Sequence, residues 1–373
     1  MVRVTREQFR PEDHPNDHFL LTTVVGSYPK PKWHDRAREL HEVDDTGETS
    51  TVTTVRNPQD WPDFDEDAWE EAKDDAARII TKEHERAGLD AVVDGEMRRN
   101  EMVEYFAHRI DGYEFNGPVK VWGHNYFDKP SVVDEVARTE QWLVEEYECT
   151  SSVASRPVKV PITGPYTLAR WSFNEVYEDT RELAVELADL VNEEIEQLVE
   201  AGARYVQIDE PALAQKPDDH AIVGEALEHI AADVPDDVRI GLHVCYGDYS
   251  RIYPEVLEFP IDELDLELCN GDYEQLDVFE DPEFTKDLAL GVVDAHVAEV
   301  ESVEEIEENI KRGFEVVPPE QLTVSPDCGL KLLPRTVAYR KMENLVTAAR
   351  EVEAKLDAGE IEVPAAKETV SAD

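Results

Sequence analysis

Short runs of strand-forming residues alternate with amphipathic helical patterns along most of this 373-residue chain. Helical patterns fill the connections, and parallel strands need such crossovers between them. The chain is therefore predicted to be an α/β protein with a single (β/α)8 TIM barrel, and a doubly wound open sheet is the alternative that the pattern leaves open. The eight predicted strands are Leu20–Val25, Leu89–Val93, Val158–Ile162, Tyr205–Ile208, Arg239–His243, Leu264–Leu268, Leu288–Val293 and Leu322–Val324.

Two connections exceed ordinary loop length and are predicted to be insertions after strands 1 and 2. Residues 29–65 are rich in Pro, Asp and Thr and are expected to cover the barrel, whereas residues 97–156 are expected to hold two helices and an extended segment. Because no linker is visible, one domain is predicted, with a loosely held N-terminal arm over 1–19, the barrel over 20–358 and an acidic tail over 359–373.

The charge balance restricts the partners. The chain has 86 acidic against 36 basic residues, a net charge of −50, so nucleic acid and anionic membranes are not expected to bind. No signal peptide and no apolar run of membrane-spanning length is visible. The acids are spread over predicted helices, which is typical of a halophilic protein whose folding depends on molar salt. Scarce cysteines indicate a reducing, cytoplasmic location.

The rarest residues indicate a metal site. His243 and Cys245 lie two apart in the fifth predicted strand, and strand residues i and i+2 share a face. Imidazole and thiolate are the ligands that suit zinc, although the same residues could be ordinary core. Cys328 follows the last strand, and Glu267 ends the sixth, so the two could complete a four-ligand set. Cys269 is a rival ligand to Glu267, and Cys149 is expected to lie on a helix.

Nine segments, in order along the chain, resemble the catalytic domain of cobalamin-independent methionine synthase. The resemblance runs from about residue 20 to residue 350 and implies a (β/α)8 barrel that methylates a thiol. The segments are Thr22–Ser27, Asp94–Asn100, Met102–Phe106, Thr163–Pro165, Trp171–Phe173, Gln207–Leu213, His243–Tyr246, Asp294–His296 and Pro326–Lys331.

The resemblance implies a role for individual residues. It implies one zinc ion on His243, Cys245, Glu267 and Cys328, which demotes Cys269. It implies that homocysteine is the substrate. The remaining implied site residues are Glu96 and Asp209 for the substrate's ammonium group, Val25, Gly26 and Ser27 for its carboxylate, Trp171 as a stacking platform, His296 as the catalytic proton donor and Asp294 as the residue that orients His296.

The methyl donor stays open between a methylated corrinoid and a methyl-tetrahydropterin or folate. Long family members carry a second half before this one, and fewer than 20 residues precede the first strand here, as in short archaeal forms. Gln215 stands where the long enzymes have an acid that helps to hold the pterin, and the segment around Trp122–Pro130 is also altered. Both differences favour a corrinoid, and a corrinoid protein or another protein that supplies the donor is a candidate partner.

Two other functions compete with homocysteine methylation. A related barrel enzyme could methylate another thiol such as coenzyme M, but Glu96 and Asp209 argue against a substrate without an ammonium group. A non-catalytic paralogue with a structural zinc would not need His296.

Overall fold

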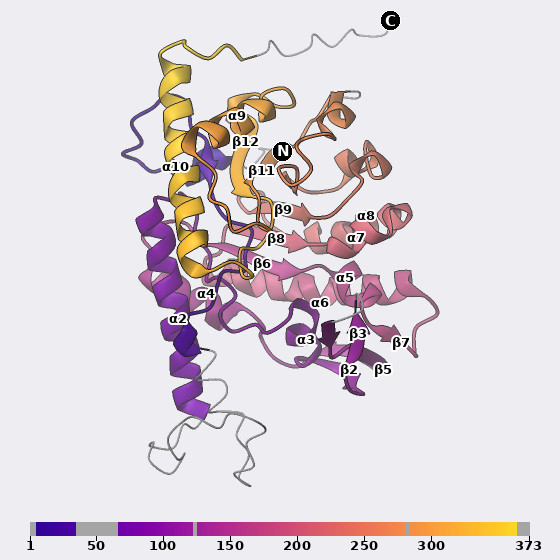
Figure 1. Ribbon diagram of the computed structural model, residues 1–373. Helices are drawn as coiled ribbons and strands as arrows, with labels where there is room; N and C mark the ends of the chain where they lie inside the picture. The colour runs from indigo at the N-terminus through magenta and orange to yellow at the C-terminus, as the bar shows by residue number, and fades with distance from the viewer. Residues whose placement is uncertain (1–4, 35–65, 122–124, 281–282, 364–373) are drawn as a thin grey trace, which may run out of the picture.

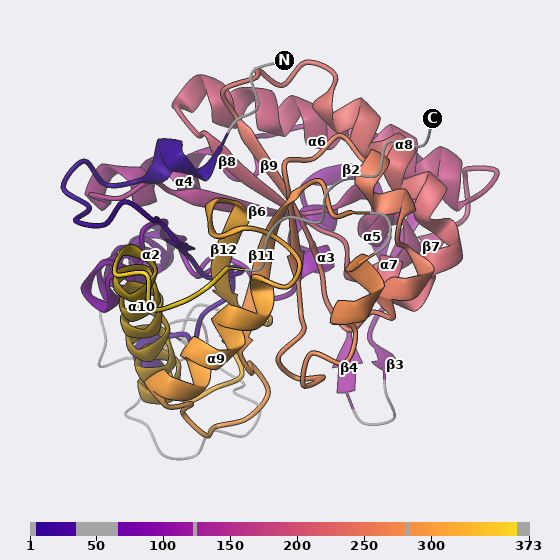
Figure 2. The same cartoon turned by 90° about the horizontal axis from the view of Figure 1, so that it is seen from above.

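The computed structural model describes residues 5–34, 66–121, 125–280 and 283–363. Its largest sheet has seven parallel strands in the order β1-β12-β11-β10-β9-β8-β6. Seen from above in Figure 2, these strands converge on the centre of the molecule and the helices surround them. The strands are β1 Leu21–Thr22, β6 Lys159–Thr163, β8 Tyr205–Asp209, β9 Arg239–Val244, β10 Glu263–Leu266, β11 Asp287–Val293 and β12 Leu322–Pro326.

The second predicted strand, Leu89–Val93, closes the sheet. Residues 89–93 lie between β1 and β6, with Val92 paired in parallel to Val158. On one side the Ala91 amide donates to the Thr22 carbonyl at 3.1 Å, and on the other the Lys159 amide donates to the Val92 carbonyl at 2.8 Å. Both edges of the seven-stranded sheet are thereby bonded to one segment. The predicted α/β barrel is confirmed, although its first two strands are shorter than expected.

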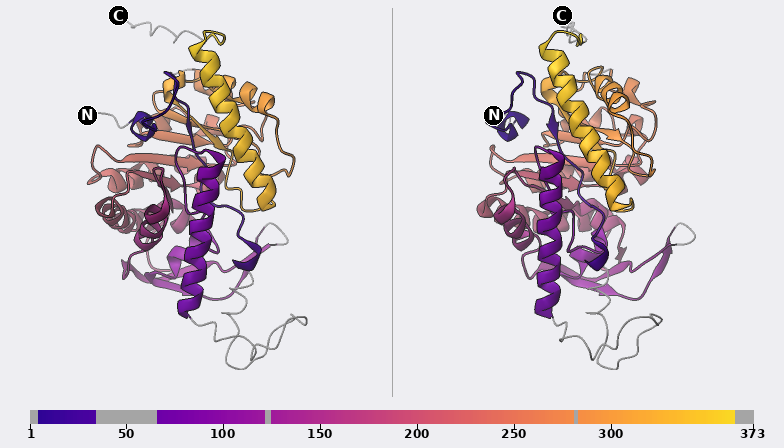
Figure 3. Two further views of the ribbon diagram at one scale, coloured as in Figure 1. Left: turned by 90° about the vertical axis from the view of Figure 1, so that its left-hand side faces the viewer. Right: turned by 60° about the vertical axis from the view of Figure 1, so that its left-hand side comes forward.

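The helices form a layer around the barrel, and α2 and α10 run side by side along one flank (Figures 1 and 3). Helix α2 ends before Gly88, whose φ of 96° provides the expected C-cap. Its buried face includes Ala76 and Ile80, whereas Ile79 is exposed. The helices are α2 Glu66–Ala87, α3 Met102–Ala107, α4 Val144–Val153, α5 Pro165–Arg170, α6 Thr180–Ala201, α7 Pro211–Gln215, α8 His220–Ala231, α9 Val303–Gly313 and α10 Arg335–Asp357.

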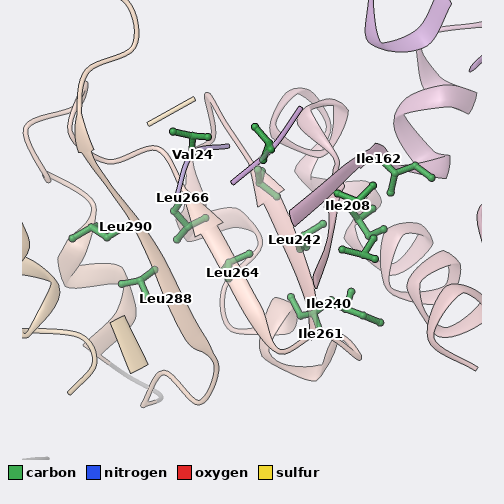
Figure 4. Packing of buried hydrophobic residues seen from close by; sticks show 14 of the residues in the cluster. Val24, Ile162, Ile208, Ile240, Leu242, Ile261, Leu264, Leu266, Leu288 and Leu290 are labelled. Atoms are coloured by element: carbon green, nitrogen blue, oxygen red, sulfur yellow. The ribbon is translucent and has the colours of Figure 1, made fainter. Parts of the chain in front are cut away.

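Alternate residues of each strand face different surroundings. Ile240 and Leu242 of β9 belong to the apolar cluster that packs the strands against the helices (Figure 4). Their neighbour Arg239 is fully buried and pairs with Glu263 and Asp287, each at 2.8 Å. Because strand side chains repeat with period two, the face that carries Arg239 at the start of β9 carries His243 near its end. The barrel interior is therefore polar and leads to the predicted site.

The N-terminal arm packs against the barrel. In the 3-10 helix η1 (Arg6–Phe9), Arg6 is buried and donates to the Pro319 carbonyl. The Phe9 ring lies 5.1 Å from that of Tyr205, at the start of β8. The expectation of a loosely held arm is therefore wrong for these residues, because their apolar and guanidinium groups are buried. Residues 364–373 of the expected tail lie outside the described residues.

The second insertion contains more β-structure than expected. The insertion contains β2 (Ile110–Phe115) and β5 (Pro130–Arg138), which form a separate three-stranded sheet with β7 (Phe173–Asn174), a strand that follows α5. It also contains β3 (Val119–Val121), which pairs with β4 (Asn125–Phe127). The expected helices are α3 and α4, and Cys149 lies on α4 as predicted. Of the first insertion, residues 35–65 lie outside the described residues. Among the residues that are described, no helix is both long enough and apolar enough to span a membrane.

Candidate methyltransferase site

Three predicted metal ligands meet at the carboxyl end of the barrel. His243 lies near the end of β9, Cys245 directly follows that strand, and Cys328 follows β12. Their ligand atoms all lie within 4.8 Å of one another. We call these three residues the His–Cys cluster. It combines one imidazole with two thiols, a donor set that suits zinc.

The surroundings of the His–Cys cluster favour the ionised form of the Cys328 thiol. His243 Nδ1 lies 3.2 Å from Asp265 Oδ1, and neither ring nitrogen has a hydrogen-bond partner among the described residues. A hydrogen bond from Cys245 and the nearby imidazole of His243 lower the pKa of Cys328, although burial acts in the opposite direction. A thiolate at Cys328 beside an unsatisfied imidazole is the arrangement that a cation would complete.

The fourth predicted ligand, Glu267, lies beside the cluster rather than within it. Its two carboxylate oxygens accept hydrogen bonds from the Tyr246 amide and the Asn270 side chain, both at 3.0 Å. Burial raises its pKa, and the charge of Cys328 acts in the same direction. The rival ligand Cys269 also lies outside the cluster. Its sulfur accepts a hydrogen bond from the Asn309 side chain at 3.7 Å.

Glu96 and Asp209 lie within electrostatic range of each other. Asp209 ends β8 and accepts a hydrogen bond from Gln207 Nε2 at 2.7 Å. Burial raises the pKa of Asp209 to about 7; the charge of His243 opposes this shift and that of Glu96 adds to it. Two carboxylates that repel each other, Asp209 buried and Glu96 half-buried, are suited to receive a cationic group.

The turn at residues 25–27 contacts both parts of the site. The Val25 carbonyl accepts from Gln207 Nε2 at 3.0 Å, and the Ser27 carbonyl accepts from the Leu330 amide at 2.7 Å. A Cβ at Gly26 would lie 2.7 Å from Glu96 Oε1, so a larger residue there would displace the Glu96 carboxylate. The turn is therefore held between β8 and the loop that carries Cys328.

His296 contacts the predicted residue Asp294 and one residue that the sequence reasoning missed. Its Nδ1 lies 3.0 Å from Asp294 Oδ1, and its Nε2 lies in short contact with the Tyr246 hydroxyl. Tyr246 has a φ of 61° and is 63% exposed, which is unusual for a large aromatic side chain. In the sequence, only the position of Tyr246 directly after the His-x-Cys pair could have indicated that it belongs to the site.

Asp327 and Glu210 are buried acids whose roles were also missed. Asp327 accepts hydrogen bonds from the amides of residues 268, 269 and 270, and so fixes the turn after Glu267. Glu210 accepts from the Tyr166 and Thr167 amides at the start of α5. Burial raises the pKa of each carboxyl to about 7.

Trp171 follows α5 and donates its indole N–H to Gln215 Oε1 at 3.2 Å. A cleft of about 680 Å³ opens beside the loop after Cys328 and is lined by Lys30, Lys32 and Lys331 among others. The residues of the His–Cys cluster do not line this cleft.

The comparisons with known proteins fit this arrangement. The family described as "Cobalamin-independent synthase, Catalytic domain" matches residues 20–351. The chain belongs to this family. It is therefore an enzyme, a methyltransferase, and the non-catalytic alternative is wrong.

Relatives in the family are of similar length to this chain. The methionine synthase of Sulfurisphaera tokodaii is 41% identical over 90% of this chain and 94% of its own length. That of Pyrococcus furiosus is 39% identical over 91% of this chain and 94% of its own length. The solved structure of a B12-independent methionine synthase from Shewanella, in complex with selenomethionine, has a TM-score of 0.75 at 25% identity and covers 91% of this chain and 99% of its own.

Proposed function

We propose that this family member transfers a methyl group to the sulfur of L-homocysteine and so makes L-methionine, with one zinc ion at the His–Cys cluster. The observation that carries the proposal is the meeting of His243, Cys245 and Cys328 within 4.8 Å at the barrel's carboxyl end. In barrel enzymes this end carries the chemistry. The relatives named methionine synthase support the choice of reaction.

The residues present fit zinc. His243, Cys245 and Cys328 would hold the ion, and Glu267 would serve as a fourth ligand that can yield to substrate. A bound zinc ion would supply Lewis acidity that lowers the pKa of a substrate thiol, which is about 8.5 for a free cysteine-like thiol. The contact of His243 Nδ1 with Asp265, which orients the ring, and the lowered pKa of Cys328 support this assignment.

The amino-acid part of homocysteine is assigned to the residues beside the cluster. Glu96 and Asp209 would bind its ammonium group, because a cation relieves the repulsion between the two carboxylates. The turn of Val25, Gly26 and Ser27 would face its carboxylate. Selenomethionine, bound in the Shewanella structure, is the selenium analogue of the proposed product and supports an amino-acid site in this fold.

Methyl transfer itself is a displacement at carbon. The sulfur–carbon bond forms as the bond from the methyl carbon to the donor's cobalt or nitrogen breaks, and the bonding electron pair leaves with the donor. Where a nitrogen leaves, it needs a proton. His296 would supply it from Nε2, since Asp294 engages Nδ1 and so orients the ring.

The donor is assigned to the class of methylated corrinoids, with methyl-tetrahydropterins as the competing class. Gln215, which replaces an acid of the long enzymes, accepts a hydrogen bond from Trp171. An amide in that position offers less to a pterin than a carboxylate does, because its charge is absent. A protein that delivers the corrinoid would be the corresponding partner.

Assays with defined donors and acceptors test the proposal. Purified zinc-loaded protein is given methylcobalamin or a methyl-tetrahydropterin, with homocysteine and coenzyme M in competition. We expect methionine as the main product and methylcobalamin as the better donor. Preferential methylation of coenzyme M would refute the substrate assignment, and faster turnover with the pterin would refute the donor assignment alone.

A further inference from the structure

Behind Glu96 lies a buried group of charged residues that the proposed chemistry does not use. We call Asp94, Arg99, Tyr105 and Glu146 the Arg99 cluster. Asp94, Arg99 and Glu146 are each no more than 6% exposed. Glu146 lies on α4, in the insertion rather than in the barrel, and so connects that insertion to the site.

Backbone contacts hold Glu96 in an unusual conformation. Its φ is 57°, in the left-handed region that few residues other than glycine adopt. Its amide donates to Asp94 Oδ1 at 3.0 Å, and its carbonyl accepts from the Arg99 amide at 3.1 Å. In this conformation the Glu96 side chain points toward the turn at Gly26.

Arg99 forms ion pairs with two carboxylates, Glu96 and Glu146, but donates a hydrogen bond only to Glu146. Its Nη2 donates to Glu146 Oε2 at 3.4 Å, whereas its Nη1 lies 3.9 Å from Glu96 Oε1 and donates to the Pro161 carbonyl at 2.9 Å. Glu146 is fixed in turn, since its Oε1 accepts from the Tyr105 hydroxyl at 2.7 Å. The neighbouring Arg98 is engaged elsewhere, with Glu70 and Asp74.

We propose that Glu146 is a positioning residue that keeps Arg99 beyond hydrogen-bond distance of Glu96, at 3.9 Å, and so leaves the oxygens of the Glu96 carboxylate to the ammonium group of the substrate. Without a carboxylate at residue 146, the guanidinium would turn its charge to Glu96, the nearest remaining anion. Glu96 would then be neutralised by Arg99 instead of by the substrate. The inference rests on the proposed function and assigns Glu146 to the selection of thiols that bear an α-amino group.

The direct test is Glu146→Gln, which keeps the shape of the side chain and removes its charge. The acceptors are homocysteine and 4-mercaptobutanoate, which is the same thiol acid without the amino group. We expect KM for homocysteine to rise about tenfold with kcat little changed, since binding is lost equally in the ground and transition states. KM for 4-mercaptobutanoate should stay the same. Calorimetric binding of both thiols to the variant provides a readout that is independent of turnover.

Glu145→Gln is the matched control, because Glu145 precedes Glu146 on α4 and is exposed. It should leave both KM values unchanged. Tyr105→Phe covers the case in which Glu146→Gln fails to fold. It removes the hydroxyl that fixes Glu146 and should raise KM for homocysteine selectively by about threefold, the effect of one lost hydrogen bond.

The outcomes separate this inference from the function on which it rests. If the unmodified protein binds both thiols equally well, the ammonium site at Glu96 and Asp209 is wrong. If it prefers homocysteine but the Glu146 and Tyr105 variants keep that preference, the ammonium site stands and the role of Glu146 is refuted. Equal losses for both thiols would also refute it, because they indicate a general structural effect.

Discussion

Asp209 is a buried carboxyl whose charge depends on what lies beside it. With no cation bound, burial raises its pKa from 3.8 to about 7. A carboxyl with a raised pKa in the folded protein binds a proton that the unfolded chain has already released. Between those two values, stability therefore falls as the pH rises, and the substrate's ammonium would favour the ionised form.

Asp209→Asn tests this shift in metal-free protein. The variant cannot titrate, so we expect it to gain stability relative to the unmodified protein between pH 5.5 and 7, by up to about 1.4 kcal/mol per pH unit. Thermal unfolding at pH 5.5 and 7.5 measures the difference. Asp236→Asn, at an exposed position, is the control and should show no such trend. Parallel stability curves for the Asp209 variant would contradict the shifted pKa.

Single residues could be predicted from the sequence where their type is rare and their spacing is regular. His243 and Cys245 share a face because strand residues alternate, and Cys328 follows another strand of the same sheet. Contacts between distant segments left no such signal. Glu146 reaches Arg99 from a helix of the insertion, and Tyr246 meets His296 only because its backbone adopts a positive φ.

Eight strands were expected, and the sheet contains seven with an eighth segment closing it. The buried parallel strands were visible because each contains apolar or β-branched residues at alternate positions, although polar residues such as Gln207 and Asp265 interrupt them. The sheet of β2, β5 and β7 was missed, since β2 and β5 carry exposed acids such as Glu114, Asp134 and Glu135 that interrupt an apolar pattern. The arm was misjudged because one aromatic ring and one guanidinium are too few to form a periodic pattern.

Phe9→Ala tests the contact of the arm with the barrel. The ring is 5% exposed and packs on Tyr205, so its loss should lower the free energy of unfolding by about 3 kcal/mol. Phe173→Ala is the control, because that ring is 45% exposed, and it should change stability by less than about 1 kcal/mol. Denaturant unfolding measures both. An equal, small effect of the two substitutions would show that the arm does not stabilise the barrel.

The molecule as a whole combines a polar barrel interior with a strongly acidic surface. Arg239 in the interior is paired with Glu263 and Asp287, which compensates the burial of these charges. The net charge of −50 affects solubility and association but does not determine the fold. The expected dependence on molar salt stays a prediction. The carboxyl ends of β9 and β12 lie at the same end of the barrel, and the proposed zinc site lies there.

Cys328→Ser tests that site most directly, with Cys269→Ser as the matched control, because Cys269 follows β10 of the same sheet but lies outside the His–Cys cluster. Zinc content per chain and methionine formation from homocysteine are measured for both variants. We expect the Cys269 variant to keep one zinc ion and its activity, and the Cys328 variant to lose both. Retention of zinc and turnover after the Cys328 substitution would contradict the proposed zinc site.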